Sequence, residues 1–351
     1  IPEYFHWFFS QKKFVELCAN ASSGTTNRIR LREDKFLDIP IELPSLLEQE
    51  RQMSKIKNIH RANMQLRFHI DNELSLIAQL RQAILQEAVS GKLVPQDPND
   101  EPASELLKKI KAEKEKLIRE GKIKKDKPLL SITGEEIPYE LPNGWEWIGF
   151  GDIFRFIDYR GKTPVKVESG VKLITAKNVR MGYIKKDPEE FVSEATYTAW
   201  MTRGFPQKGD LLFTTEAPMG NVCQVPIDEK FALAQRTINL HPFEKLESKY
   251  LMYAIMSLPI QNLIAGLATG MTATGIKAAK LKNVQIPLPP LSEQYRVVKK
   301  VDQLMKLCDE LETKVKENQK NSELLMDAVL KEAFENSSID SNIAATNLQR
   351  V

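Results

Sequence analysis

The sequence has few of the residues that build covalent cross-links or metal centres. Only three of its 351 residues are cysteine and four are histidine. The cysteines (Cys18, Cys223 and Cys308) form no Cys-x-x-Cys pair, and their odd number argues against a disulfide framework. The histidines are scattered, so no zinc-ligand spacing is visible. We therefore expect a protein of a reducing, cytoplasmic environment with no metal site.

Long apolar runs are also missing. The most apolar stretch, Tyr250 to Leu267, is interrupted by Pro259, Gln261 and Asn262. A membrane-spanning helix needs a run of about 18 or more apolar residues, so none is predicted. The first residues, Ile-Pro-Glu-Tyr-Phe-His-Trp, lack the basic start and cleavage pattern of a signal peptide. We expect no membrane association.

What the sequence does have is a globular composition with a net charge of only +3. Charged residues make up 28% of the chain and hydrophobic residues 42%. A chain with this proportion of apolar residues and little net charge buries enough surface to fold, which excludes disorder over most of its length. Its length allows two or three packed units.

An internal repeat organises the chain. Residues 41–51 (IELPSLLEQER) recur as residues 286–296 (IPLPPLSEQYR), an offset of 245 residues. The match continues in residues 83–88 and 328–333, and it extends upstream, shifted by one residue, to Glu3-Tyr4-Phe5 and Lys249-Tyr250-Leu251. The sequence therefore predicts a globular unit and a long helix, followed by a second globular unit and a second long helix.

Each repeated element begins a long helix. Proline is tolerated at a helix start, and acidic Glu48 and Glu293 suit the positive end of the helix dipole. In the second helix, apolar or small residues recur at steps of three and four: Val301, Leu304, Cys308, Leu311, Val315, Asn318, Ser322, Leu325 and Val329. The first helix has a less regular stripe, with Arg67 and Arg81 intruding among Met53, Ile56, Ile70, Leu74, Ile77, Ile84 and Ala88. These patterns favour an antiparallel coiled coil about 65 Å long, the alternative being two unrelated bundle helices.

The region between the two long helices divides into a linker and a domain. Gly91, Pro95, Pro98 and Pro102 end the first helix, and a lysine-rich helix follows from about residue 103. This charged helix is interpreted first as a solvated connector and second as a contact for phosphates. From Leu141 to Pro290, short β-type runs alternate with turns, which predicts an α+β domain.

Motifs for catalysis are missing from this domain. Gly161-Lys162-Thr163 resembles the end of a phosphate-binding loop, but the glycine required five positions earlier is Phe156. There is no dinucleotide-binding fingerprint and no nucleophile elbow. Aspartate and glutamate do not follow metal-ligand spacing. We therefore expect no catalysis by this chain alone.

The domain instead carries several polar loops flanked by small residues. They are residues 159–164, 175–180, 235–237 and 269–277, and they contain arginine, asparagine, threonine and lysine. Such side chains bond base edges and phosphates in protein–DNA complexes. Lysine and arginine outnumber aspartate and glutamate by only 18 to 14 between residues 141 and 290, so charge by itself is a weak indication of DNA binding.

Taken together, these segments resemble the specificity subunit of type I restriction-modification enzymes. The resemblance covers nearly the whole chain. It depends on the two Leu-Pro-x-Leu-x-Glu-Gln-x-Arg helix starts (43–51 and 288–296), on AVSGKLVPQ at 88–96 and on ASELL at 103–107. It depends also on LPNGWEW at 141–147, on GDLLF at 209–213 and on Gly220-Asn221-Val222. No single piece is specific, but the combination is.

The resemblance implies an α+β protein in which target-recognition domains of mixed β-sheet and helices are joined by two long antiparallel coiled-coil helices. In this family two recognition domains each read half of a split DNA sequence, and the helices fix the spacing and dock methyltransferase subunits. Restriction subunits join the same assembly. The chain itself is then non-catalytic and binds no cofactor, whereas partner subunits use S-adenosylmethionine, ATP and Mg. The expected partners are double-stranded DNA, methyltransferase subunits and restriction subunits.

The resemblance also implies boundaries and DNA contacts. The expected divisions are the end of a first recognition domain (1–46), the first long helix (47–90), a linker with a charged helix (91–140), the second recognition domain (141–291), the second long helix (292–336) and a disordered tail (337–351). Carried over by position, the candidate DNA contacts are Arg160, Lys162, Thr163, Lys177, Asn178, Arg180, Arg236, Thr272 and Lys277, with Thr25 and Arg28 in the first domain.

The first domain departs from the family pattern, because only about 45 of its residues are represented. The chain is then either an N-terminally truncated fragment or a natural half-size subunit that pairs with itself. A second class of function also stays open: a protein-interaction scaffold built on the coiled coil, which reads no DNA sequence. A reader loses affinity steeply with salt yet keeps its sequence preference, whereas a scaffold binds DNA only weakly and without preference.

Overall fold

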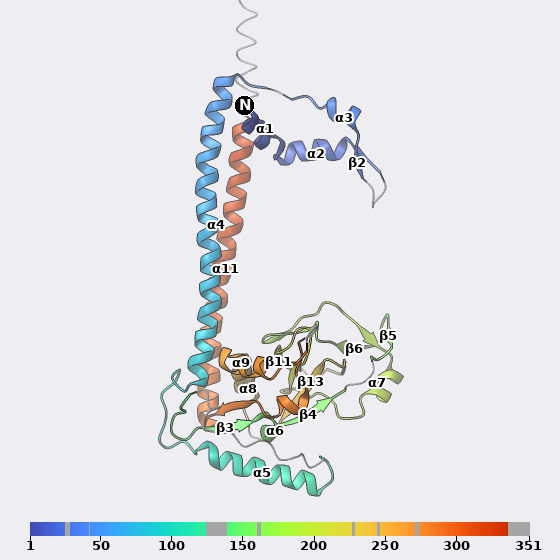
Figure 1. Cartoon of the computed structure of the whole chain (residues 1–351), viewed down its shortest axis with the longest axis vertical. Coiled ribbons are helices and arrows are strands. Elements are labelled where there is room, and N and C mark those ends of the chain that lie inside the picture. The colour runs from blue at the N-terminus through green and yellow to red at the C-terminus, as the bar shows by residue number, and fades with distance from the viewer. Residues whose placement is uncertain are drawn as a thin grey trace, which may run out of the picture. The chain divides into compact units, whose positions relative to one another are not determined.

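The computed structural model describes residues 1–24, 29–41, 43–123, 139–159, 163–226, 229–243, 246–270 and 274–335. These form two compact units, shown in Figure 1. The first contains Ile1–Ala78 and the part of the last helix from Asp309 onward, and the second contains Gln79–Cys308. The tail expected from residue 337 lies outside the described residues.

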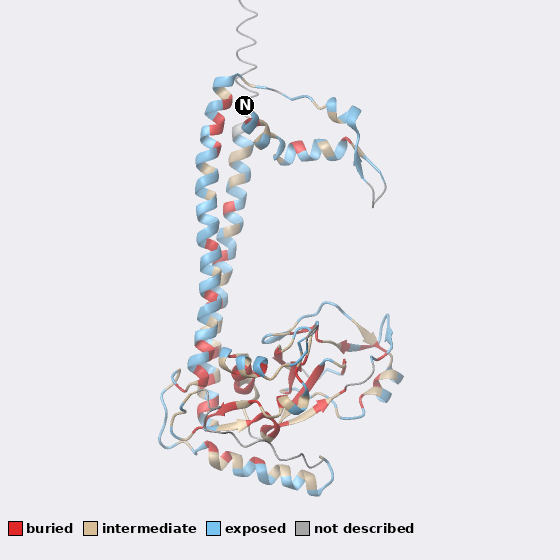
Figure 2. Ribbon diagram, viewed as in Figure 1, coloured by how far each residue is buried: buried red, intermediate tan, exposed pale blue. Residues whose placement is uncertain are grey.

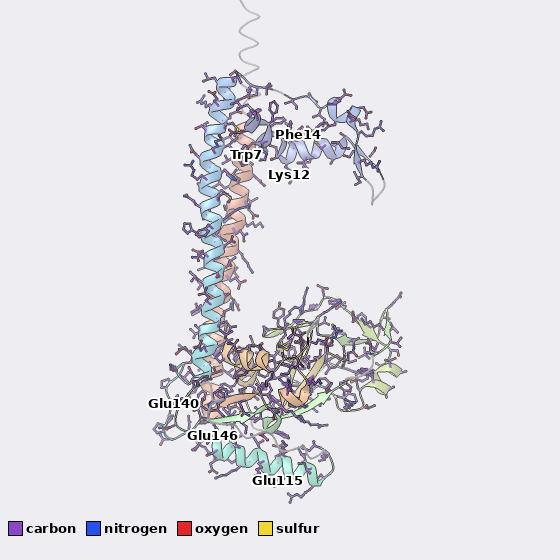
Figure 3. All side chains as sticks on the ribbon, viewed as in Figure 1. Trp7, Lys12, Phe14, Glu115, Glu140 and Glu146 are labelled. Carbon is purple, nitrogen blue, oxygen red and sulfur yellow. The ribbon has the colours of Figure 1, made fainter. Side chains whose placement is uncertain are left out.

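The first unit is helical and has an aromatic core. Its elements are α1 (Pro2–Phe9), α2 (Lys12–Asn20), the short strands β1 (Ser22–Ser23) and β2 (Arg30–Leu31), α3 (Glu33–Leu37) and most of α4 (Leu46–Val89). Tyr4 of α1 is buried with Met53 and Ile56 of α4. Trp7 and Phe14, labelled in Figure 3, lie on α1 and α2. The Trp7 ring is 4.9 Å from the His60 ring, so aromatic contacts hold α1 against α4.

The second unit contains the domain expected between residues 141 and 291, and its fold is α+β as predicted. Its elements are α5 (Ala103–Arg119), β3 (Glu146–Gly149), α6 (Phe150–Ile153), β4 (Phe154–Asp158), β5 (Lys166–Val167), β6 (Val171–Ile174), β7 (Val179–Arg180), β8 (Tyr183–Ile184), β9 (Phe191–Val192), α7 (Glu194–Trp200), β10 (Leu211–Thr214), β11 (Val222–Gln224), β12 (Phe231–Leu233), β13 (Thr237–Pro242), α8 (Ser248–Met256), α9 (Leu258–Gly266), α10 (Ala278–Leu281) and β14 (Gln285–Leu288), followed by the first part of α11 (Leu291–Glu335).

Two four-stranded sheets form the core of this unit. One has the order β11-β10-β13-β4, with all neighbours antiparallel, and the other has the order β12-β6-β9-β5. The strands of these sheets carry many of the buried residues of the unit (Figure 2). Every residue of β10 is buried, and strands flank it on both sides. Strands buried on both faces appear in sequence as continuous apolar runs, and Leu211-Leu212-Phe213 is such a run.

The charged helix α5 packs on this unit through one apolar edge. Ala103, Leu106 and Ile110 are buried, at spacings of three and four residues. On its polar side, Lys108 pairs with Glu105 and Lys109 pairs with Glu101. Lysines that are already paired locally support the interpretation of α5 as a connector.

The repeat found in the sequence is also a repeat of structure. The helices α1, α2, α3 and α4 are followed in the same order by α8, α9, α10 and α11. The start of α11 lies 245 residues after the start of α4, as Leu291 lies after Leu46, and the start of α9 lies 246 residues after that of α2. We call residues 2–89 the first repeat and residues 248–335 the second repeat.

A glutamine in each repeat makes the same connection. Gln294 Nε2 donates to the Pro289 carbonyl at 2.9 Å, and its Oε1 accepts from the backbone N–H of Glu247, the residue that caps α8. Gln49 Nε2 donates to the Pro44 carbonyl at 2.8 Å, and its Oε1 accepts from the amino group of Ile1, which caps α1. In each repeat, the glutamine therefore connects the start of the long helix (α4 or α11) to the start of the first short helix of that repeat (α1 or α8).

The two long helices pair antiparallel. In the first unit Asn63 of α4 bonds to Ser322 of α11, and in the second unit the Arg81 Nη1 lies 3.9 Å from the Met305 Sδ. The residue number rises along one helix as it falls along the other, which confirms the antiparallel arrangement. The stripe predicted on α4 is largely buried: Met53, Ile56, Ile70, Ile77, Ile84 and Ala88.

The seam of α11 is narrower than the sequence predicts. Of the nine residues predicted to form the seam, only those at intervals of seven are buried, namely Val301, Cys308, Val315 and Ser322. Leu311 and Leu325 are exposed, and Asn318 is exposed as well. Between Lys57 and His69 no residue of α4 is buried. This stretch of α4 is mainly polar, so it offers α11 little apolar surface against which Leu325 could be buried.

A buried carboxylate joins α11 to the domain and the linker. Glu293 is 1% exposed, and its two carboxylate oxygens accept from Gln96 Nε2 (3.2 Å) and Trp145 Nε1 (3.0 Å). One turn later, Arg296 Nη2 lies 2.6 Å from the Asp100 Oδ2. The start of α11 therefore contacts both the linker and the entry to the domain, and it fixes the orientation of the domain on the helix.

Removing the Glu293 charge is expected to change stability in a pH-dependent way. Burial raises the pKa of the Glu293 carboxyl, against the lowering effect of its two hydrogen bonds. A raised carboxyl pKa favours the protonated form in the folded state, so this contribution is present at acid pH and is lost as pH rises through the folded-state pKa. The Tm of the parent minus the Tm of Glu293→Gln should therefore decrease as the pH is raised from 4 to 7. Thermal unfolding at a series of pH values measures this difference.

The chain contains a matched control for this experiment. Glu48 occupies the same position in the first repeat but is partly exposed, with Arg51 at 4.0 Å. Glu48→Gln should change stability by about 0.5 kcal/mol or less, as exposed ion pairs generally contribute little. A Tm difference for Glu293→Gln that does not vary with pH would contradict the prediction.

Candidate nucleic-acid interface

Three loops meet at one end of the sheet that contains β10 and β13. Because these strands are antiparallel, the residue after β10 and the residue before β13 lie at the same end. Thr215 connects the loops there. Its N–H and hydroxyl donate to the Arg236 carbonyl (3.0 and 3.3 Å), and its own carbonyl accepts from the Ile276 N–H at 3.0 Å. We call residues 215–221, 234–236 and the described parts of 267–277 the loop cluster.

The backbone of the loop cluster is closely packed. Gly275 forms bridges with both Glu216 and Thr269. A Cβ at position 275 would lie 3.1 Å from the Thr215 carbonyl oxygen, so the close approach of the two loops favours glycine there. Ala217 has a φ of 49°, which is unusual for a residue other than glycine and stores strain in the turn.

The loop cluster presents basic side chains to solvent. The Arg236 side chain is 50% exposed, and its Nη2 lies 3.6 Å from the Glu216 Oε1. Lys277, which precedes α10, is exposed. An exposed guanidinium on a rigid loop has the geometry for bidentate bonding to guanine or phosphate. The Glu216 carboxylate is the present partner of this guanidinium. An anionic ligand would take its place as the partner of Arg236.

A second cluster of polar residues adjoins the first. It is the turn at residues 175–178 with the hairpin β7–β8, and Asn178 lies at its centre. Asn221 of the loop cluster donates from Nδ2 to the Val179 carbonyl at 3.0 Å, and the Gly182 N–H donates to the Val222 carbonyl at 2.8 Å. The hairpin and the loop cluster are therefore one connected surface.

The predicted DNA contacts occupy different environments. Arg236 and Lys277 are brought together on the loop cluster, and Arg180 lies on the adjoining hairpin, where its Nη1 donates to the Val179 carbonyl at 3.1 Å. Lys177 and Thr163 are exposed. Arg160, Lys162, Thr272, Thr25 and Arg28 lie outside the described residues. As DNA contacts, all of these residues stay predictions.

Asn178 is held inside the turn. It is 1% exposed; its Oδ1 accepts from the N–H and hydroxyl of Thr175, and its Nδ2 lies within 3.4 Å of the carbonyls of Lys185, Lys186 and Pro188. These bonds use the hydrogen-bonding capacity of the amide. In this structure Asn178 shapes the turn that presents Lys177 and Arg180, and its side chain has no surface to offer to a base.

Sequence reasoning missed the residues that organise this surface. Thr215 and Asn221 were not predicted as site residues, because each acts through bonds to segments more than 20 residues away in the chain. A signal was present in the run of threonine, proline, glycine and asparagine between two β-type segments, residues 214–221. Such a run predicts a turn, but not which loops the turn contacts.

The titratable groups nearby serve the structure. The Asp210 carboxylate is 2% exposed and contacts the His241 Nδ1 at 2.7 Å. It also accepts from Asn239 Nδ2 (2.6 Å) and from the Gln207 N–H (2.9 Å). Burial raises the pKa of the Cys223 thiol to about 12, so this cysteine stays protonated at neutral pH.

The described part of the chain offers neither a metal-binding cluster nor a membrane-spanning helix. Among those residues, no group of three or more histidine, cysteine, aspartate or glutamate side chains is placed to hold a metal ion. Nor is any helix in that part both long and apolar enough to cross a bilayer.

Comparisons with known proteins identify relatives of this architecture. Residues 142–320 match the family model described as the type I restriction modification DNA specificity domain. The chain is 36% identical over 263 residues to the type I restriction enzyme EcoAI specificity subunit of Escherichia coli. This match covers 71% of the chain and 43% of that protein. It is 33% identical over 270 residues to the EcoEI specificity subunit of the same species, covering 72% of this chain and 44% of that protein.

A solved structure has the same fold. A chain from work on complex assembly and conformational transition of the type I R-M system superimposes with a TM-score of 0.67 at 20% sequence identity. The superposition covers 96% of this chain and 71% of the other. The matches to the two Escherichia coli relatives span less than half of those proteins' length.

Proposed function

This chain belongs to the type I restriction-modification DNA specificity family, and we propose that it recognises DNA sequence for a methyltransferase and restriction complex. In this proposal the second unit reads one half of a split target. The connected surface of the loop cluster and the β7–β8 hairpin is the reading face. The observation that carries the proposal is the bonding of Thr215 to two other loops, which brings Arg236 and Lys277 onto one rigid surface.

The reading face has the features that direct readout needs. Base recognition uses side chains such as arginine and lysine held in fixed geometry, because each hydrogen bond depends on direction. Backbone bonds hold the loops at their bases, while Arg236, Lys177 and Lys277 extend into solvent. The Glu216 carboxylate lies 3.6 Å from the Arg236 guanidinium, on the neighbouring loop of the same cluster.

The long helices are proposed to act as spacer and docking rod. The distance between two half-sites on DNA is set by protein geometry, and a helix pair is stiff. Large apolar residues remain exposed along these helices, among them Met64, Phe68 and Leu76 on α4 and Leu307, Leu311 and Leu325 on α11. Exposed apolar residues repeated along a helix pair support docking of further helices, which we assign to the methyltransferase subunits.

The remaining assignments follow from the family. We propose the division into a first recognition-domain end, first long helix, linker, second recognition domain and second long helix, as the sequence predicts. The complex acts on double-stranded DNA in the cytoplasm, and the methyltransferase and restriction subunits use S-adenosylmethionine, ATP and Mg. The chain itself contributes binding and geometry rather than catalysis.

Removing the two basic side chains of the loop cluster should abolish reading by this unit. Arg236→Ala with Lys277→Ala should reduce modification of the half-site by about a hundredfold, since each specific contact contributes about 1–3 kcal/mol. The measurement is base-modification sequencing of host DNA after co-expression with the companion methyltransferase. Co-purification of the methyltransferase should be unchanged, because the long helices are untouched.

The control removes the same charge from another surface of the same unit. Lys172 and Lys230 are each half exposed and each lie near a glutamate, as Arg236 does. Lys172→Ala with Lys230→Ala should leave the modified sequence and its extent within about twofold of the parent. Equal losses in both variants would indicate a general charge effect. Unchanged modification in the Arg236/Lys277 variant would contradict the reading face.

A further inference from the structure

The two repeats are similar in fold but differ at the positions where they contact each other. The offset of 245 residues pairs Asn63 of α4 with Cys308 of α11, and Ile77 of α4 with Ser322 of α11. Cys308, Ile77 and Ser322 are all buried, and Asn63 is half-buried. Asn63 and Ser322 are polar, whereas Cys308 and Ile77 are apolar. Each polar position in one repeat is therefore equivalent to an apolar position in the other.

The two polar positions satisfy each other. Asn63 Nδ2 donates to the Ser322 hydroxyl at 3.0 Å and approaches the Ser322 carbonyl at 3.2 Å. Ser322 is 4% exposed, so this contact is shielded from water. A single asparagine in a coiled-coil seam is known to select partner and register, because an unmatched partner leaves its amide without a bond.

A second pair of equivalent contacts differs in charge. In the first repeat, Glu3 of α1 pairs with Lys57 of α4. In the second repeat the equivalent residues are Lys249 of α8 and Asp302 of α11, whose Nζ and Oδ2 are 2.7 Å apart. The signs are reversed, so each globular unit meets opposite charge on its own long helix and would meet like charge on the other.

We propose that these differences make the two repeats non-interchangeable, so that α4 pairs with α11 rather than with α4 of a second copy. Asn63 is the principal determinant. In an antiparallel pair of two α4 helices with the same register, Asn63 of each copy would face Ile77 of the other. Two amides would lose their bonds to Ser322, and the like pair would be disfavoured by about tenfold or more. This inference concerns assembly of the chain and does not depend on DNA reading.

The same geometry provides a direct assay for the disfavoured pair. In the register of two α4 helices, residue 70 would lie on the two-fold axis and face its own copy. In the observed register, residue 70 lies opposite residue 315, and both Ile70 and Val315 are buried. Ile70→Cys should therefore form a disulfide between copies only when α4 pairs with α4, since a disulfide needs its two Cβ atoms about 4 Å apart.

The experiment compares Ile70→Cys in three forms of the full chain without DNA. These are the parent, Asn63→Ile with Ser322→Ala, and Val315→Ala. After mild oxidation, the dimer is measured on a non-reducing gel, and each form without Ile70→Cys corrects for Cys18, the most exposed of the three native cysteines. Sedimentation velocity measures association in the same samples.

Asn63→Ile with Ser322→Ala should raise the amount of cross-linked dimer about tenfold. In this variant the layer at residue 63 is apolar both when α4 pairs with α11 and when it pairs with α4 of a second copy. Val315→Ala weakens the seam but removes no polar bond, so it should lower Tm and leave the cross-link near the level of the parent. The proposal is overturned if the Asn63/Ser322 variant cross-links no more than the parent. It is also overturned if Val315→Ala cross-links as much as that variant, since loosening alone would then explain the dimer.

Discussion

Under the proposed function, lengthening both long helices by one heptad is expected to move the two halves of the split DNA target about three base pairs further apart. Seven residues add about 10 Å to an α-helix, and B-DNA rises 3.4 Å per base pair. Duplicating residues 64–70 in α4 and residues 315–321 in α11 inserts one heptad in each helix between the Asn63–Ser322 and Ile70–Val315 layers. A seven-residue insertion keeps the same face of each helix on the seam.

Base-modification sequencing after co-expression with the methyltransferase reads the outcome directly. The half-site sequences should be unchanged, the original spacing should no longer be modified and a longer spacing should replace it. The matched control inserts the heptad in α4 alone. This control shifts the seam of one helix past the other, so modification should be lost at every spacing. An unchanged spacer in the double insertion would contradict the proposed role of the helices.

Asp210→Ala is expected to cost about 3–5 kcal/mol of unfolding free energy. The buried carboxylate accepts from three donors, Gln207 N–H, Asn239 Nδ2 and His241 Nδ1. Asn239 is fully buried, its Oδ1 has no hydrogen bond among the described residues, and its Nδ2 would lose the Asp210 acceptor. A buried donor left without an acceptor costs about 1–3 kcal/mol, and hydrogen bonds to charged groups are the stronger ones.

Urea unfolding of the full chain tests this value, with the transition of the second unit followed by tryptophan fluorescence. Asp152→Ala is the control, because Asp152 is 46% exposed and its ion pair with Lys114 spans 3.7 Å. That change should cost about 0.5 kcal/mol or less. A loss below about 1 kcal/mol for Asp210→Ala would show that the network contributes little to the domain.

Much of the architecture could be predicted because it depends on local pattern. The long helices follow from apolar spacing and from the prolines before them, and the repeat was visible because short motifs recur at one offset. The predicted stripe of α4 is buried, as Ile56 and Ile70 show. The error on α11 has a physical reason: periodicity shows which residues share a face, but burial depends on what the opposing helix offers, and the stretch of α4 around Asn63 is mainly polar.

The candidate interface was less predictable because its geometry comes from distant contacts. Arg236 and Lys277 are 41 positions apart, and their loops are joined through the bonds of Thr215 and the bridge between Glu216 and Gly275. Asn178 illustrates the opposite problem. Asparagine after a strand is equally typical of a DNA contact and of a residue that bonds the backbone of its own turn, and only the structure shows its five bonds.

The shared glutamine connection at the two helix starts has a consequence for the exchange of globular units. Gln49 and Gln294 make the same bonds within similar stretches of sequence. The groups that each glutamine bonds upstream are backbone atoms, so the connection does not depend on which side chains those residues carry. Exchange of everything upstream of the glutamine would therefore leave the long helix and its connection intact. Under the proposed function, a new DNA specificity would be gained by exchanging a whole globular unit rather than by changing single residues.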